Sequence, residues 1–375
     1  MDFTDLPDLA VRTLGGSVVA ANDELFAERE NLIKPQPAVF NAHTFGHKGQ
    51  VYDGWETRRR REPGHDWAIV RLGVPGVVRG VVIDTAFFTG NYPETCSVEA
   101  AAVAGYPSPE ELADADWVEL VPRSAVKGDT RNLFPVASEE SYNYVRLNMF
   151  PDGGVARLRV HGEVVADPRW LAGAPLDLAA LENGGVVTDC SNMFYSSPNN
   201  LLLPGKARVM GDGWETARRR DDANDWVEVR LAAQGVVRQV EVDTTHFKGN
   251  APGWFRFSGA AGGDWVELIP RTRLQPDTRH VFRVAGAGPA DRVRIDVYPD
   301  GGFARLRVYG DLTSDGRARL GLNWFNRLPA NRLAVILADE AGISVEDAHR
   351  LAAARPVDSL DESVAARVRA LVLGG

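Results

Sequence analysis

Two glutamates are the carboxylates best placed for acid–base chemistry, because each stands in the same string, Asp-Gly-Trp-Glu-Thr. They are Glu56 and Glu215, and on an extended strand each shares a face with nearby arginines, namely Arg58, Arg60 and Arg219. A carboxylate beside guanidinium groups can transfer protons while those groups grip an anionic substrate through paired hydrogen bonds. A solvated strand face with surface ion pairs gives the same pattern.

The second copy of this region carries a titratable pair that the first copy lacks. His246 and Lys248 stand where the first copy has Phe87 and Thr89. Alternation along the strand predicts that the pair points to the inner face, at the strand end just before Asn250. Imidazole titrates near neutral pH, so this histidine suits acid or base catalysis. The alternative is a histidine satisfied by a neighbouring backbone group.

Other histidines give weaker signals. His280 replaces Asn132 after a repeated Asp-Thr-Arg string, which makes it a second candidate for the site. His43 and His47 have metal-ligand spacing, but their segment reads as a loop and no third ligand is evident. No cofactor is therefore predicted, and a divalent metal is left open.

Composition excludes several classes of function. The chain has 375 residues, 44% of them hydrophobic and 25% charged, with a net charge of −9. That charge, without a basic stripe, argues against nucleic acid as a partner. No apolar run approaches a membrane span, and residues 1–5 lack the features of a secretory signal. Cys96 and Cys190 have no CxxC spacing, so a cytoplasmic protein is predicted.

The elements that position these residues are predicted to be short strands. Residues 81–88 and 240–246 alternate with a period of two, and residues 145–150 with 157–160 read as a hairpin around Pro-Asp-Gly-Gly. Gly, Pro, Asn and Asp clusters separate the strands. This pattern predicts a mainly β protein with two tandem antiparallel jelly-roll or β-sandwich domains and a small C-terminal helical tail.

Four segments are expected from the repeat and the composition. The first sandwich spans residues 15–166, a short helical linker spans 167–183, and the second sandwich spans 184–312. After that point Ala, Leu, Arg and Glu dominate, which predicts a separate helical tail over residues 320–375.

The repeated motifs resemble the allantoicase repeat over residues 15–312. The matching strings lie at residues 53–61 and 212–220, 84–91 and 243–250, and 129–131 and 277–279, with Pro-Asp-Gly-Gly in both copies. Allantoicases contain two such repeats, each a jelly roll similar to galactose-binding-like domains, and convert allantoate and water to ureidoglycolate and urea in purine degradation. One departure from the family pattern is Ala217, where the first copy has an arginine.

The tail has a resemblance of its own. Residues 324–329 and 353–356 resemble the first helices of the ureidoimidazoline (OHCU) decarboxylases. In those enzymes a catalytic His-Pro segment lies further downstream, and no histidine follows His349 in this chain. We therefore expect a structural or assembly role for the tail, without decarboxylase activity.

Under the allantoicase resemblance, the candidate residues divide into two groups. The acid and base roles fall to Glu215, Glu56 and His246, while substrate binding falls to Arg58, Arg60, Arg219, Lys248, Asn250 and His280. The implied partner is the small molecule allantoate, and a homo-oligomer is left open. The rival hypotheses are a non-catalytic tandem ligand- or carbohydrate-binding protein on the same fold, and a related ureido enzyme such as ureidoglycolate lyase.

Overall fold

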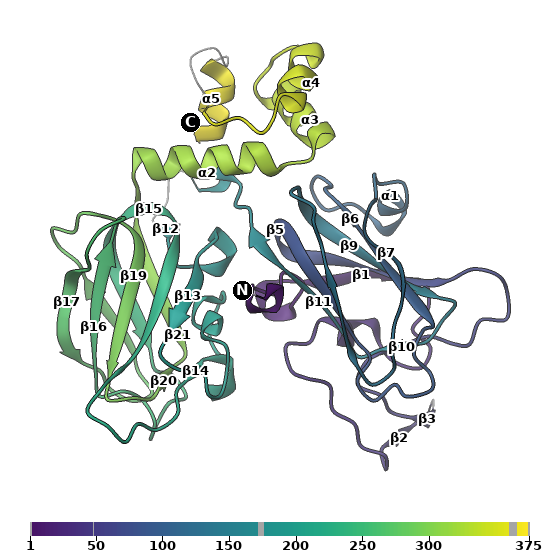
Figure 1. The fold of residues 1–375 in the computed structure, drawn as a ribbon, viewed down its shortest axis with the longest axis horizontal. Coiled ribbons are helices and arrows are strands. Elements are labelled where there is room, and N and C mark those ends of the chain that lie inside the picture. Colours follow the sequence, from purple (N-terminus) through teal and green to yellow (C-terminus); the bar gives the residue numbers. More distant parts are fainter. Residues whose placement is uncertain (1, 48, 172–175, 360–365, 374–375) are drawn as a thin grey trace. The chain divides into compact units, whose positions relative to one another are not determined.

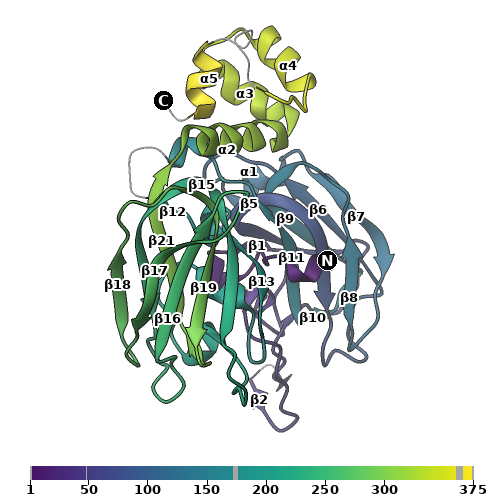
Figure 2. The same ribbon diagram turned by 60° about the vertical axis from the view of Figure 1, so that its left-hand side comes forward.

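The computed structural model describes residues 2–47, 49–171, 176–359 and 366–373. The chain divides into two compact units, drawn as ribbons in Figures 1 and 2. The first unit comprises Met1–Val165, Arg327–Asp339 and Ile343–Arg355, and the second comprises Ala166–Asn326, Glu340–Gly342 and Pro356–Gly375. Parts of the predicted linker and tail, residues 172–175, 360–365 and 374–375, lie outside the described residues.

The first unit contains an antiparallel sandwich, called the first sandwich below. Its main strands are β1 (Ser17–Ala21), β5 (Asp66–Asp84), β6 (Thr95–Ala101), β7 (Val118–Ala125), β8 (Arg131–Pro135), β9 (Ser141–Phe150) and β11 (Arg157–Val164). They follow the order β1-β5-β9-β6-β7, and β8 and β11 also pair with β5. The first part of the long strand β5 pairs with β1 and β9, and its last part pairs with β8 and β11.

The second unit repeats this plan in the second sandwich. Its main strands are β12 (Leu176–Asp177), β13 (Val186–Cys190), β15 (Asp225–Asp243), β16 (Trp254–Ala260), β17 (Val266–Arg273), β18 (Arg279–Arg283), β19 (Pro289–Tyr298) and β21 (Arg305–Leu312). Their order is β12-β21-β15-β19-β16-β17, with β13 and β18 pairing with β15. Leu176 and Asp177, which the sequence suggested as linker, pair instead with β21.

Short strand pairs carry the turns at one end of each sandwich. In the first, β4 (Trp55–Glu56) pairs with β10 (Gly154–Val155), and in the second β14 (Trp214–Glu215) pairs with β20 (Gly302–Phe303). A further small hairpin, β2 (Phe45–Gly46) with β3 (Gly49–Gln50), occurs in the first sandwich. Each predicted glutamate therefore lies on a short strand and is paired with the last glycine of the Pro-Asp-Gly-Gly motif.

Helices are short and lie mainly near the C-terminus. The α-helices are α1 (Pro109–Ala113), α2 (Ser314–Arg327), α3 (Ala330–Glu340), α4 (Val345–Ala353) and α5 (Ala366–Leu373). Short 3-10 helices are η1 (Phe3–Asp5), η2 (Arg12–Leu14), η3 (Arg29–Ile33), η4 (Pro168–Trp170), η5 (Leu181–Asn183), η6 (Pro198–Leu202) and η7 (Met210–Asp212). None of the described helices is long and apolar enough to cross a membrane.

Contacts within each unit hold the tail helices in place. In the first, Asn331 at the start of α3 donates to Asp116, just after α1 (2.8 Å), and Arg327 pairs with Glu139. In the second, Gly321 of α2 lies against α5, where a Cβ atom would fall 2.3 Å from the carbonyl oxygen of Val372. The predicted fold class is confirmed, since antiparallel β-sandwiches dominate and the tail is helical.

Strands β7 and β17 each contain a proline. Each ends the strand order of its sandwich, and each contains a proline in its middle, Pro122 in β7 and Pro270 in β17. Proline has no N–H to donate to a ladder, so it is tolerated in a sheet mainly at an edge.

The Ala-Arg-Leu-Arg motif supplies a buried arginine beneath each Asp-Gly-Trp-Glu turn. Arg157, 1% exposed, pairs with Asp53 (2.7 Å) and donates to the carbonyl oxygens of Gln36, Pro37, Asp53 and Ala156. Arg305 donates likewise to the carbonyl oxygens of Gly205, Asp212 and Ala304. Buried carbonyl groups need donors, so these arginines fix the backbone that carries Glu56 and Glu215.

Replacing Arg157 by alanine should therefore destabilise the first sandwich strongly. The change leaves several buried carbonyl groups without their donor and removes the buried ion-pair partner of Asp53, and we expect a loss of about 3–5 kcal/mol. Denaturant unfolding followed by tryptophan fluorescence measures this. The matched control is Arg58→Ala, which removes an exposed guanidinium from Asp23 while the N–H groups of residues 25 and 58 still donate to that carboxylate, and it should cost less than about 1 kcal/mol. Equal losses in the two variants would contradict the anchoring role of Arg157.

Candidate functional site

Each candidate glutamate is held by an asparagine from the Gly-Asn turn of its own sandwich. The side-chain N–H of Asn250 donates to Oε1 of Glu215 at 2.7 Å, and that of Asn91 donates to Oε1 of Glu56 at the same distance. No described residue donates to the second carboxylate oxygen of either glutamate. Sequence reasoning selected Asn250 but not Asn91, although the repeat of Gly-Asn carried the signal.

Close packing of the glycine turns brings these residues together. The N–H of Gly302 donates to the carbonyl oxygen of Asn250 at 2.9 Å, and Gly302 is the register partner of Glu215. A Cβ atom on Gly302 would lie 2.5 Å from the ring of Phe247, so only glycine fits. The turn of residues 244–250 is thereby fixed against β14.

His246 does not point to the core, and the prediction that it faces inward is wrong. Strand β15 ends at Asp243, and His246 has a φ of 74°, in the left-handed region. This turn shifts the alternation by one residue, so the following Phe247 is fully buried while His246 is partly exposed. The first sandwich shows the same shift, with Phe87 at a φ of 67° and 40% exposed and Phe88 buried.

The ring of His246 has a defined hydrogen-bonding state. Its Nε2 lies 3.1 Å from the carbonyl oxygen of Ala207. A carbonyl oxygen only accepts, so Nε2 carries a proton and Nδ1 is left to accept one. Neighbouring Lys248 is exposed and forms no hydrogen bond or ion pair with any residue in the described part of the chain. An imidazole nitrogen that can accept a proton and an exposed lysine ammonium group therefore lie in the same turn as Asn250.

The three predicted arginine grips already have carboxylate partners. Arg58 pairs with Asp23 at 2.6 Å and Arg60 pairs with Asp66 at 2.7 Å. These pairs oppose the prediction that the side chains bind substrate, because their guanidinium groups are already engaged. Other arginines of the same runs are exposed and make no ion pair with a described residue, namely Arg59, Arg61, Arg218 and Arg220.

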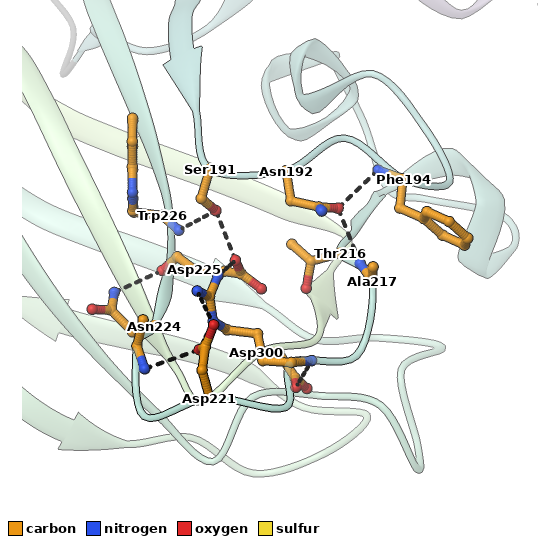
Figure 3. Close-up of polar contacts among 12 residues, drawn as sticks. Ser191, Asn192, Phe194, Thr216, Ala217, Asp221, Asn224, Asp225, Trp226 and Asp300 are labelled. Atoms are coloured by element: carbon orange, nitrogen blue, oxygen red, sulfur yellow. Dashed lines mark hydrogen bonds and ion pairs between the residues drawn. The ribbon is translucent and has the colours of Figure 1, made fainter.

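Arg219 is the most fully engaged of the three. Its Nη1 lies 2.8 Å from Oδ1 of Asp225, and its Nε and Nη2 bind the two oxygens of Asp221 at 2.9 and 3.2 Å. Figure 3 shows Asp225 at the centre of these contacts, with Ser191 above it and Asp221 below. Ser191 donates to Asp225 and accepts from the N–H of Trp226, each at 2.9 Å. This cluster ties the start of β15 to the loop before it.

His280 serves the backbone. Its Nδ1 donates to the carbonyl oxygen of Val242 at 3.1 Å, and its Nε2 accepts the N–H of Gln275 at 2.9 Å. Asn132 makes the equivalent pair of bonds in the first sandwich, to Ile83 and from Lys127. Both ring nitrogens are therefore occupied by backbone groups, which opposes the predicted substrate-binding role of His280.

The first sandwich covers its version of the site with aromatic rings. Segment 34–52, which is longer than its counterpart 203–211, supplies Phe40 and Tyr52. Phe40 stacks on Tyr52 at 5.1 Å between ring centroids and on Phe87 at 5.7 Å, and Tyr52 stacks on Phe88 at 5.1 Å. Burial raises the pKa of the Glu56 carboxyl above its usual 4.5, while the hydrogen bond from Asn91 lowers it.

Metal ligands do not gather in the described residues. His43 and His47 are exposed in the segment before β4. Within residues 2–47, 49–171, 176–359 and 366–373, no group of three or more His, Cys, Asp or Glu side chains is arranged to hold a metal ion.

Comparison with known proteins gives a consistent picture. The family model described as "Allantoicase repeat" matches residues 7–165 and 176–313. A probable allantoicase of Nocardia farcinica is 59% identical over 314 residues, which are 83% of this chain and 95% of that protein. One of Streptomyces coelicolor is 54% identical over 335 residues, covering 85% and 89% of the two chains. The crystal structure of allantoicase from Saccharomyces cerevisiae superposes with a TM-score of 0.74 at 37% identity, covering 81% of this chain and 92% of that one.

The raised pKa of Glu56 predicts a pH-dependent effect of Glu56→Gln on stability. A carboxyl whose pKa is higher in the folded state favours folding when protonated, so the wild type loses stability as pH rises from below 4.5 through the folded pKa. The variant lacks this loss. Its melting temperature relative to wild type should rise across that range and then level off. A difference that stays constant from pH 3.5 to 7 would contradict the buried setting of Glu56.

Proposed function

The chain belongs to the allantoicase family, and from this membership we infer that it hydrolyses allantoate to ureidoglycolate and urea. The observation that carries this inference is the match of both repeats, residues 7–165 and 176–313, to one family model. The activity is that of a hydrolase acting on a C–N bond of a linear ureido compound, in purine degradation.

The reaction sets three requirements for the site. The central carbon of allantoate bears a carboxylate and two ureido groups. Water replaces one ureido group, so a C–O bond forms, a C–N bond breaks and a proton reaches the departing nitrogen. The site must supply a base for the proton that water loses, an acid for the leaving nitrogen and a cation that orients the carboxylate.

We place this chemistry in the second sandwich. His246 offers Nδ1 as a base, because Nε2 donates to the carbonyl oxygen of Ala207. Glu215, held by the hydrogen bond from Asn250, is the second group for proton transfer. Lys248, exposed and without an ion pair to a described residue, takes the cationic role first expected of Arg58, Arg60 and Arg219.

Backbone strain supports the role of His246. A residue other than glycine at a φ of 74° is uncommon and costs free energy, and such residues cluster at functional sites. Phe87 occupies the same strained position in the first sandwich, where it stacks on Phe40. The first sandwich therefore uses this position for packing, and we propose that the second uses it for chemistry.

Some expectations stay predictions. A cytoplasmic location, a homo-oligomer and a structural or assembly role of the C-terminal helices rest on the sequence alone. The requirement for a divalent metal is also left to experiment.

Purified protein should release urea from allantoate, and the rate should be measured with and without a chelator. Activity that survives chelation places the reaction on protein groups alone. Activity that is lost on chelation and restored by added metal keeps the enzyme and calls for ligands beyond the residues proposed above. Absence of urea under every condition would overturn the proposed function and favour a ligand-binding protein on the same fold.

His246→Phe should lower kcat by about 10²–10⁴-fold with a smaller change in KM, because general acid–base groups contribute on that scale. Phenylalanine already occupies the matching strained position at Phe87, so the fold should tolerate it. The control is His349→Gln, on the exposed face of α4, which should leave kcat unchanged. A His246→Phe enzyme within a few-fold of wild type would show that the base lies elsewhere, as would full activity in Glu215→Gln for the partner role.

A further inference from the structure

We propose that Asp277 is a positioning residue for this reaction, holding His246 in its strained conformation without touching the substrate. The inference rests on the proposed function, since it assigns Asp277 a role through His246. It goes further because it names the group on which the placement of the base depends.

The contact is a single hydrogen bond to the strained residue itself. Oδ1 of Asp277 accepts the main-chain N–H of His246 at 2.8 Å. In return, the N–H of Asp277 donates to the carbonyl oxygen of Phe247 at 3.1 Å. These two bonds clasp the turn at the residue with positive φ and at the residue after it. A conformation of this kind persists only when its surroundings over-determine it.

Asp277 is itself held in place. Its φ is 50°, a conformation that aspartate and asparagine adopt more readily than most residues. Beside it, the hydroxyl of Thr244 donates to the carbonyl oxygen of Gln275 at 2.6 Å and accepts the N–H of Thr278 at 3.0 Å. The loop that presents Asp277 is thus fastened to the start of the turn that it supports.

The clasp decides where Nδ1 of His246 lies. The backbone of His246 is fixed by Asp277, and the far side of its ring is fixed by the carbonyl oxygen of Ala207. Loss of the first contact frees the turn to relax toward ordinary φ values, which carries the ring away from its position. Displacements of about 1 Å at a reacting group can cost about 10²-fold in rate.

The first sandwich holds the same clasp around a residue that cannot transfer protons. Oδ1 of Asp129, at a φ of 48°, accepts the N–H of Phe87 at 2.8 Å. Asp129 therefore provides a control matched in geometry. Its removal disturbs an equivalent turn in the same protein without affecting the base.

The experiment compares Asp277→Ala, Asp277→Asn and Asp129→Ala in the full chain, by steady-state urea release from allantoate and by thermal unfolding. Asp277→Ala should lower kcat by about 10–100-fold with little change in KM. Asp277→Asn keeps the Oδ1 acceptor and tolerates the positive φ, so it should recover kcat to within a few-fold of wild type. Asp129→Ala should show a similar decrease in melting temperature and a kcat close to wild type.

Two outcomes would overturn the proposal. Equal decreases of kcat in Asp277→Ala and Asp129→Ala would mean that both clasps serve stability alone. An Asp277→Asn enzyme as impaired as Asp277→Ala would mean that the charge, and not the hydrogen bond to His246, matters. The His246→Phe variant distinguishes a failure of the proposed function. Full activity in that variant would show that His246 is not the base, whatever the Asp277 variants do.

Discussion

A buried guanidinium group under each Asp-Gly-Trp-Glu turn is the interaction on which the rest of the site depends. Arg157 and Arg305 donate hydrogen bonds to main-chain carbonyl groups of these turns and of the residue before each arginine. Burial lowers the pKa of Arg305 to about 10, yet the group stays charged at neutral pH. With this backbone fixed, the short strand pair, the glycine turn and the Gly-Asn turn can meet at fixed distances.

On that shared frame the two sandwiches carry different side chains at the strained position. The same strained position holds Phe87 in one copy and His246 in the other, and the same clasp holds both. In the first copy a longer preceding segment adds Phe40 and Tyr52, which close over the turn. In the second copy the turn carries a partly exposed imidazole and an exposed lysine. Duplication thus allowed one copy to keep a packing role while the other carries titratable groups.

The sequence predicted the architecture well because strand periodicity and turn residues are local signals. Alternation over residues 157–160 and the Pro-Asp-Gly-Gly turns sufficed to predict an antiparallel sandwich, which the structure confirms. Side-chain roles were harder to predict. The predicted alternation fails at His246 because a single residue with positive φ shifts the side chains around it to the opposite face.

Two predicted site residues, Arg58 and His280, have structural partners that the sequence did not reveal. Arg58 pairs with Asp23, which no spacing rule connects to it. His280 imitates an asparagine side chain, so a change that suggested chemistry preserves a structural contact. Two of the predicted site residues, Glu215 and Asn250, are joined by a hydrogen bond, and Glu56 accepts the equivalent bond from Asn91, which the sequence reasoning did not select.

The prolines in the outermost strands have a consequence for how a duplicated chain avoids misassembly. Two sandwiches with the same strand order invite exchange of a strand between copies or stacking of chains edge to edge, a known failure of repeat proteins. Pro122 and Pro270 interrupt the N–H row of β7 and β17, which end the strand orders of their sheets. The sequence thereby protects both sheets against aggregation at the same structural position, independently of any demand from catalysis.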